Sequence, residues 1–259
     1  MPSGGTYKTR GVVLRKTKLG EKDLIVTLID ESGSLVRAVA KGARKPGGSF
    51  AARIELFSLV DCLFARGKSL DVISEARFAK GHESRTLDLE QAACASAIAE
   101  LVCNVSQEGL EQPRLYEMTA AAIDAIAASE PADALAITAA DLLKVLASAG
   151  FRPSFDVCVS CGLPIELGDA DAGQWMSVSF EDGGVVCPSC ARLANGVPIE
   201  ASTLAWARAL LYTRFSDVPA LEVDAGVSLS VLQFARQWAR VHTGRDLKSA
   251  DFLFTAGLF

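Results

Sequence analysis

Two short stretches dictate how the second half of this chain folds: Cys158-Val159-Ser160-Cys161 and Cys187-Pro188-Ser189-Cys190. In each, two residues separate a pair of cysteines, so both thiolates can coordinate one soft divalent ion. Two such pairs supply the four sulfurs of a tetrahedral Zn²⁺ site, with bonds of about 2.3 Å. We therefore predict one structural zinc ion held by Cys158, Cys161, Cys187 and Cys190.

The segment between the two cysteine pairs has the pattern of a β-hairpin. Residues 175–180 form a strand-like run, Glu181-Asp182-Gly183-Gly184 is a turn signal, and Val185-Val186 leads into Cys187. This pattern predicts a zinc ribbon over about residues 152–192. Because four thiolates leave no open position for water, the ion should stabilise the fold rather than catalyse a reaction. Disulfides and a thioredoxin-like redox pair are the alternative interpretations.

The composition is that of a folded protein made in a reducing compartment. Half of the 259 residues are hydrophobic, yet no apolar run reaches the roughly 18 residues of a membrane span. Residues 1–10 are polar and basic, so we expect no export signal and a cytoplasmic location. Cys62, Cys94 and Cys103 lie in apolar contexts and are predicted to be small core residues.

Residues 6–80 have the pattern of a small β-barrel. Five strand-like runs, separated by turn signals, follow one another: residues 12–14, 24–29, 35–40, 54–64 and 70–78. Five short strands of this size suit a Greek-key barrel, of which the OB-fold is the commonest form. In the third run Val36, Ala38 and Ala40 share one face. Arg37 and Lys41 share the other, so small apolar side chains should point inward and cations outward.

From about residue 85 the apolar period becomes helical. Apolar stripes follow over residues 94–105, 115–126, 135–149, 204–215 and 231–241, with Ser202 as a candidate N-cap for the fourth. The cysteine-rich segment lies between the third and fourth stripes. We therefore expect an α+β protein of two domains: a five-stranded OB-fold barrel at residues 1–81 and a helical bundle at 82–259, with the zinc ribbon inserted.

The sequence offers little for catalysis. Its two histidines, His82 and His242, are expected at a domain boundary and near a helix C-terminus, and Thr86 stands where a metalloprotease helix would need a second histidine. Gly67-Lys68-Ser69 resembles the end of a phosphate-binding loop, but Cys62 occupies the leading glycine position. A hairpin turn carrying a cation is the better interpretation. The sequence therefore favours a binding protein over an enzyme.

Charge is divided unequally along the chain. Residues 1–81 contain 8 Lys and 7 Arg against 8 acidic residues, a net charge of +7, whereas the remainder carries −12. Such a division indicates that the basic part meets polyanions. The candidate nucleic-acid contacts are the cations of the strand runs and turns: Arg10, Arg15, Lys16, Lys18, Arg37, Lys41, Arg44, Lys45 and Lys68.

We expect Arg37, Lys41, Arg44 and Lys45 to form the centre of this surface, because they share one face and the adjoining loop. A solvated face without a ligand is the plain alternative. Aromatic residues for base stacking are few, namely Tyr7, Phe50 and Phe57. Electrostatic binding that tolerates any base sequence is therefore favoured over specific readout.

Several motifs, taken together in their order, resemble the RecO family of bacterial recombination mediators. They are Gly11-Val12-Val13-Leu14, Leu19-Gly20-Glu21-Lys22-Asp23, Ala40-Lys41-Gly42-Ala43-Arg44-Lys45, Gly150-Phe151-Arg152-Pro153, the two cysteine pairs, and Gly244-Arg245-Asp246-Leu247-Lys248-Ser249. The resemblance covers nearly the whole chain. Some members lack the cysteines, but this chain has all four.

The resemblance implies a non-enzymatic DNA repair protein that binds single- and double-stranded DNA and anneals complementary strands. It also implies action with RecR, binding to the acidic C-terminal tail of single-stranded-DNA-binding protein, loading of RecA, and association with the nucleoid. Two other classes stay open: a zinc-ribbon adaptor that joins proteins, and a thiol oxidoreductase or zinc hydrolase. Salt-dependent DNA binding and thiol titration, respectively, would distinguish them.

Overall fold

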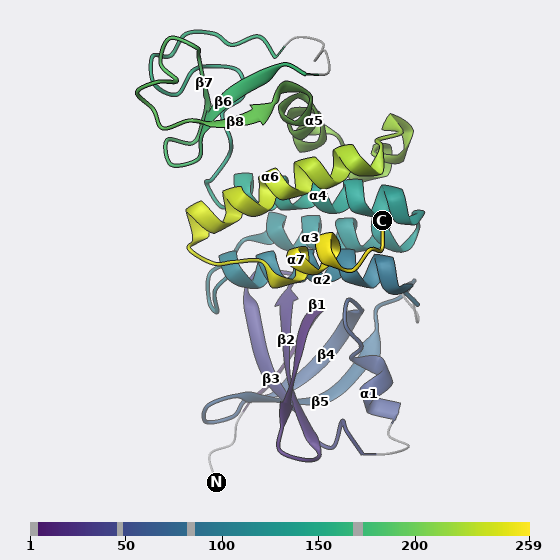
Figure 1. The fold of residues 1–259 in the computed structure, drawn as a ribbon. Helices are drawn as coiled ribbons and strands as arrows, with labels where there is room; N and C mark the ends of the chain where they lie inside the picture. The colour runs from purple at the N-terminus through teal and green to yellow at the C-terminus, as the bar shows by residue number, and fades with distance from the viewer. Residues whose placement is uncertain (1–4, 46–48, 82–85, 168–172) are drawn as a thin grey trace. The chain divides into compact units, whose positions relative to one another are not determined.

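The computed structural model describes residues 5–45, 49–81, 86–167 and 173–259 (Figure 1). The chain forms two compact units, Met1–Asp88 with Ser106–Ala127, and Leu89–Val105 with Ala128–Phe259. The expected boundary between two domains at residues 81 and 82 stays a prediction. His82 and the expected glycine-rich turn at residues 46–48 lie outside the described residues.

The first unit contains a closed barrel of five strands. They are β1 (Thr6–Leu19), β2 (Asp23–Asp30), β3 (Leu35–Ala40), β4 (Leu59–Ala65) and β5 (Asp71–Phe78), in the order β1-β2-β3-β5-β4. Every pairing is antiparallel except that of β3 with β5. The fourteen-residue β1 pairs with both β2 and β4, and a register shift between Val13 and Arg15 lets it bend around the barrel. The predicted five-stranded OB-fold barrel is confirmed.

The barrel core follows the alternation of the strands. Ala38 and Ala40 of β3 are buried beside Val26 and Leu28 of β2, while Arg37 between them is exposed. Two expectations were wrong in extent: β1 is far longer than residues 12–14, and residues 54–64 are not one strand. A short helix α1 (Ser49–Arg53) precedes β4, and the positive φ of Phe57, 68°, interrupts extended backbone before Leu59.

The segment from Ser106 to helix α3 (Pro113–Ala127) belongs to the barrel unit. Its backbone is bonded to the β2–β3 turn: Gln112 N donates to Ser32 O at 2.8 Å, and Gly109 N donates to Ser34 Oγ at 2.8 Å. A Cβ on Gly33, whose φ is +80°, would lie 1.9 Å from Gln112 O. Only glycine fits at this turn.

We expect Gly33→Ala to lower the free energy of unfolding by about 2–4 kcal/mol, since it adds a steric clash to left-handed strain. Gly20→Ala is the matched control, because Gly20 also has positive φ, +58°, but nothing lies within 4 Å of its added Cβ. Denaturant unfolding measures both. Equal losses for the two variants would contradict the close packing at Gly33.

The second unit is built around α4 (Pro131–Ser148), which is buried on nearly all sides. It packs against α2 (Leu89–Val105), α5 (Ala201–Tyr212) and α6 (Ala225–Thr243), while α7 (Lys248–Thr255) packs on α2. The helix α7 was not predicted. Ser202 is not the N-cap of α5, which follows Glu200, and Phe215 lies in a separate 3-10 turn because Thr213 and Arg214 are extended.

No helix within the described part of the chain is both long and apolar enough to cross a membrane.

The predicted hairpin is confirmed as β6 (Trp175–Ser179) and β7 (Gly184–Val186), which pair antiparallel. A third strand, β8 (Val197–Glu200), pairs with the other edge of β6. It was not expected because Gly196 and Pro198 suggest a loop, yet Pro198 is tolerated on an edge strand. We call the described residues between 152 and 200 the cysteine ribbon.

Candidate metal centre and nucleic-acid interface

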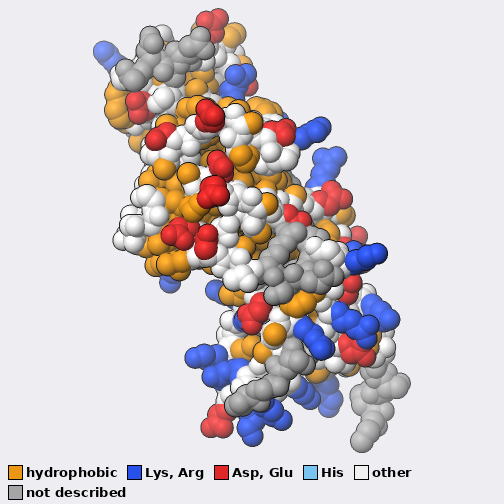
Figure 2. All heavy atoms as spheres, turned by 90° about the vertical axis from the view of Figure 1, so that its right-hand side faces the viewer, with side chains coloured by type: hydrophobic (Ala, Val, Ile, Leu, Met, Phe, Trp, Pro, Cys, Tyr) orange, Lys and Arg blue, Asp and Glu red, His pale blue; other side chains and the backbone are white. Residues whose placement is uncertain are grey.

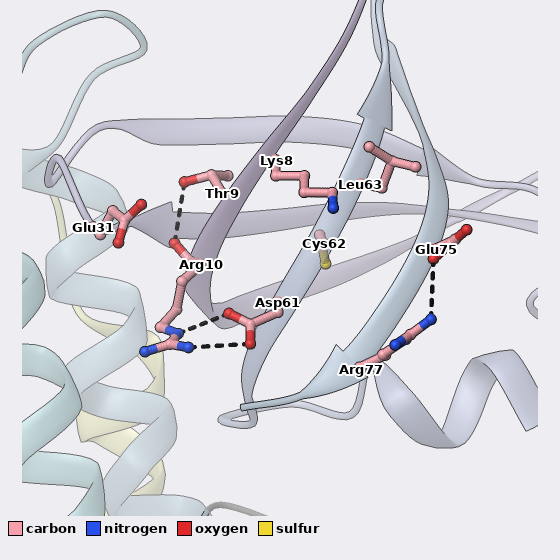
Figure 3. A pocket seen from close by; sticks show the side chains of 9 residues that line it. All are labelled: Lys8, Thr9, Arg10, Glu31, Asp61, Cys62, Leu63, Glu75 and Arg77. Atoms are coloured by element: carbon pink, nitrogen blue, oxygen red, sulfur yellow. Dashed lines mark hydrogen bonds and ion pairs between the residues drawn. The ribbon is translucent and has the colours of Figure 1, made fainter. Parts of the chain in front are cut away.

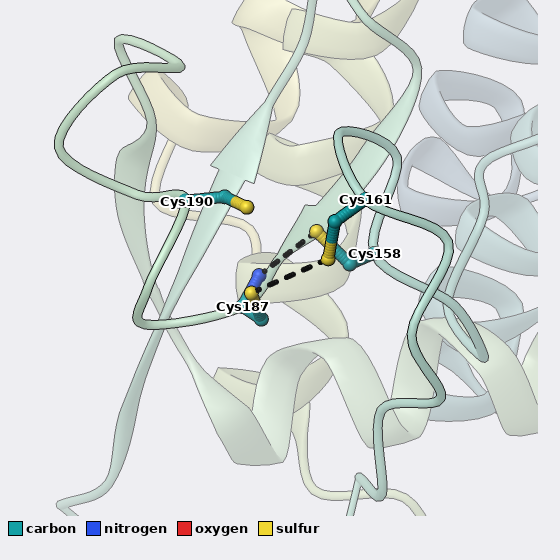
Figure 4. A group of neighbouring side chains, drawn as sticks. All are labelled: Cys158, Cys161, Cys187 and Cys190. Carbon is teal, nitrogen blue, oxygen red and sulfur yellow. Dashed lines mark hydrogen bonds between the residues drawn. The ribbon is translucent and has the colours of Figure 1, made fainter.

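The four cysteines of the ribbon converge (Figure 4). Their Sγ atoms all lie within 4.8 Å of one another, and those of Cys161 and Cys187 are 3.8 Å apart. Four sulfurs at tetrahedral corners, each about 2.3 Å from an ion, would be about 3.8 Å apart. A disulfide needs about 2.05 Å, and all four cysteines are free. The arrangement can hold a metal ion.

Backbone N–H groups prepare Cys158 for this role. The N–H of Cys187 donates to Cys158 Sγ at 3.3 Å and so lowers the pKa of this thiol to about 6, against the opposing effect of burial. The N–H groups of Cys161 and Ser160 act in the same direction. A lowered pKa favours the thiolate, the form that binds a metal. Each cysteine pair also closes its own turn, with Gly162 N donating to Cys158 O at 2.8 Å.

An aromatic cluster fixes the ribbon to α6. Phe180, at the end of β6, lies 5.7 Å from Phe234 and 5.6 Å from Trp238 between ring centroids. The indole Nε1 of Trp238 donates to Phe151 O at 2.7 Å. His242, expected near a helix end, lies in the last turn of α6, where it stacks on Phe151 and lies tilted against Trp238. Burial lowers its pKa, so the ring packs as a neutral group.

Two of the candidate DNA contacts lie in one row on the outside of the barrel. Arg15 of β1 pairs with Thr27 of β2, which pairs in turn with Arg37 of β3. Cross-strand partners point to the same face, so Arg15 and Arg37 project from one face, with their Cα atoms about 10 Å apart across two strand spacings. Figure 2 shows Lys and Arg side chains gathered over the barrel, with fewer Asp and Glu among them.

The loop after β3 adds three more of the expected cations. Arg44 Nη1 donates to Gly20 O at 3.0 Å, and Asp23 Oδ1 accepts from Gly42 N at 2.7 Å, so this loop is tied to the β1–β2 turn. Lys41 and Lys45 are exposed beside it. The exposed Lys22 of the β1–β2 turn, which the sequence reading missed, therefore joins this group.

Other candidates are placed differently. Lys16 pairs with the inward-facing Val26 across β1 and β2, and its amine forms an ion pair with Glu55 at 2.5 Å. Lys18, two residues on, shares the face of Lys16, and Lys68 lies in the β4–β5 turn. Phe57 is half-buried, and the side chain of Phe50 lies outside what the structure describes.

Arg10 lies on the opposite wall of the barrel, over β1, β4 and β5, beside a hollow of about 520 Å³ (Figure 3). It forms hydrogen bonds of 2.7 and 3.1 Å with both carboxylate oxygens of Asp61. Arg77 is within 3.5 Å of Glu75. Burial raises the pKa of the Cys62 thiol at its floor to about 12, so this cysteine is a core residue as expected. Both arginines on this wall are thus paired with carboxylates.

Comparison with known proteins gives one consistent result. Residues 1–82 match the family model described as Recombination protein O N terminal, and residues 86–251 match Recombination protein O C terminal. The chain is similar to the DNA repair protein RecO of Bifidobacterium adolescentis, 32% identical over 259 residues, covering 95% of this chain and 98% of that one. It is also similar to RecO of Nostoc punctiforme, 28% identical over 285 residues, covering 96% and 95%. With a barrel, a helical unit and a four-cysteine cluster in the matched regions, this chain belongs to the RecO family of DNA repair proteins.

Proposed function

We propose that this protein is a non-enzymatic recombination mediator that binds single- and double-stranded DNA and anneals complementary strands. The observation that carries the proposal is the outer row of Arg15 and Arg37, continued by the cations of the loop after β3. The strand 2–3 face and the adjoining loops are where OB-folds bind oligonucleotides. Cations spread over strands and loops contact phosphates without reading bases.

Annealing by such a surface needs no active site. Two DNA strands repel each other as polyanions, and a cationic barrel lowers that repulsion while it concentrates both strands. Base pairing then supplies the driving force. The candidate contacts on this surface differ in their carboxylate neighbours: the amine of Lys16 is paired with Glu55 at 2.5 Å, and Arg37 Nε lies 4.0 Å from Glu108 Oε1, while Arg15 is exposed.

We expect Arg15→Gln with Arg37→Gln to lower the slope of log affinity against log salt by about 1.4 for single-stranded DNA, since each lost phosphate contact removes about 0.7. Arg208→Gln with Arg240→Gln, on the helical unit, is the matched control, because it changes the net charge equally at exposed ion pairs. Fluorescence anisotropy over a salt series measures both. Identical salt slopes for the two double variants would show that Arg15 and Arg37 do not contact DNA phosphates.

Several further roles rest on the family rather than on described contacts. We propose that the metal is a single Zn²⁺, that RecR and the acidic tail of single-stranded-DNA-binding protein are partners, and that the protein helps load RecA at the nucleoid. The direct test is annealing of DNA coated with single-stranded-DNA-binding protein, with and without its tail. Equal rates on both substrates would exclude the tail as a partner.

A second candidate function is protein joining by the cysteine ribbon. Leu163 and Leu193, which each follow a cysteine pair, are 61% and 90% exposed, and Trp175 on β6 is 64% exposed. Exposed apolar side chains of this kind are typical of contact surfaces. An adaptor that touches DNA only incidentally would show a shallow salt dependence, whereas the mediator should lose affinity steeply with added salt.

A further inference from the structure

The turn between β4 and β5, residues 66–70, is tightly built. The carboxylate of Asp71 accepts a hydrogen bond from Gly67 N at 2.9 Å through one oxygen and from Tyr7 OH at 2.6 Å through the other. A Cβ on Gly67 would lie 1.9 Å from Leu70 O. Asp71 therefore ties the turn to the start of β1.

The first residue of this turn, Arg66, has its guanidinium held over an aromatic ring. The guanidinium of Arg66 lies 5.0 Å from the centre of the Tyr7 ring, and that ring stacks in turn on Phe64 at 5.1 Å. Arg66 N donates to Gly5 O at 3.1 Å, which fixes its backbone as well. A guanidinium that lies over a ring keeps its in-plane N–H donors available, and the residue is exposed. Lys68 is exposed two residues later.

The parallel pairing of β5 with β3 decides where the turn lies. Asp71 is the partner of Ala38, the residue after Arg37. Val72 follows beside Val39, so the turn at residues 66–70 ends next to the middle of β3. The turn thus leads into β5 beside the strand that carries Arg37, while Arg66 itself lies at the start of β1, over Tyr7.

We propose that Arg66 is a direct phosphate contact of the DNA-binding surface and that Asp71 is a positioning residue that holds the turn and the Tyr7 ring beneath Arg66. The proposal rests on the proposed DNA-binding function and adds to it a residue that the sequence analysis did not select. It identifies the ligand chemistry as a nucleic-acid phosphate. The bond from Tyr7 lowers the pKa of Asp71, which keeps this carboxyl ionised and accepting.

Arg66→Gln tests the contact. It should lower the salt slope for single-stranded DNA by about 0.7 and weaken binding at low salt several-fold. Arg77→Gln is the matched control, since it makes the same change on the same barrel at an exposed arginine over β5, away from this row. Equal slopes for Arg66→Gln and Arg77→Gln would overturn the contact, while a normal response of the Arg15 and Arg37 variants would leave the proposed function standing.

Asp71→Asn tests the positioning role, because the two explanations predict opposite changes in DNA affinity. Removing a negative charge from a cationic surface should strengthen DNA binding if charge alone mattered. Asn keeps only one acceptor oxygen, so the bond from Tyr7 or the bond from Gly67 loses its acceptor, which should instead weaken binding and lower the salt slope as Arg66→Gln does. Adding Arg66→Gln to Asp71→Asn should then change little, because the two residues act as one unit.

Unchanged or tighter binding by Asp71→Asn, or full additivity of the two changes, would overturn the role of Asp71. Should this variant fail to fold by circular dichroism, Tyr7→Leu carries the same test, because it removes the ring beneath Arg66 without altering net charge. Weaker binding and a lower slope are expected there too. An unchanged slope would overturn the proposal.

Discussion

Replacing Cys158 and Cys187 by Ser is expected to unfold the cysteine ribbon and abolish metal binding. The ribbon has only three strands of three to five residues, too little to form an independent core. In zinc domains of this size the ion supplies about 10–16 kcal/mol of apparent binding energy, which is in effect folding energy. Losing one ligand from each pair removes that energy, and the two remaining cysteines, Cys161 and Cys190, cannot complete a tetrahedral shell.

Metal analysis and limited proteolysis measure this result. The wild-type chain should hold one tightly bound zinc ion, and the double variant should hold none and be cut between residues 152 and 200. Cys103→Ser is the matched control, because Cys103 lies on α2 and outside the cluster. It should keep both the metal and the resistance to protease. A metal-free wild-type ribbon whose thiols react rapidly would instead favour the thiol oxidoreductase.

The sequence was most informative where chemistry or alternation is local. The spacing of Cys158 and Cys161 predicts a metal-binding turn from four consecutive residues, and the same holds for the second pair. Strand β3 was found with its bounds because one face of small residues alternates with Arg37. These patterns depend on neighbours within a few positions, so they can be recognised in the sequence before the fold is known.

The remaining features depend on contacts between distant parts of the chain. The assignment of α3 to the barrel unit rests on bonds such as Gln112 N to Ser32 O, and no periodicity in residues 106–127 reveals them. Likewise, Lys16 and Arg15 are equivalent as sequence, but only the folded chain shows that Glu55 lies beside Lys16. Arg66 was overlooked because its guanidinium is positioned by the ring of Tyr7, which lies 59 positions earlier in the sequence. The sequence thus identified the cations, but it did not show which of them are paired with carboxylates or held over a ring.

Trp238→Ala is expected to cost about 3–5 kcal/mol in the free energy of unfolding of the second unit, the usual cost of emptying a buried aromatic site. Trp238 is fully buried and contacts the rings of Phe180, Phe234 and His242. Its removal therefore leaves a cavity where α6 meets the ribbon. Denaturant unfolding followed by circular dichroism measures the loss.

Two comparisons separate packing from hydrogen bonding at this position. Trp175→Ala makes the same change at a tryptophan that is 64% exposed on β6, and it should cost under about 1 kcal/mol. Trp238→Phe keeps most of the ring but leaves the carbonyl of Phe151 without its indole donor, so it should cost about 1–3 kcal/mol. If Trp238→Ala were no worse than Trp175→Ala, the aromatic cluster could not be what fixes the ribbon to α6. The ribbon would then depend on its metal alone, and chelation of the wild-type protein would release it without any change in α6.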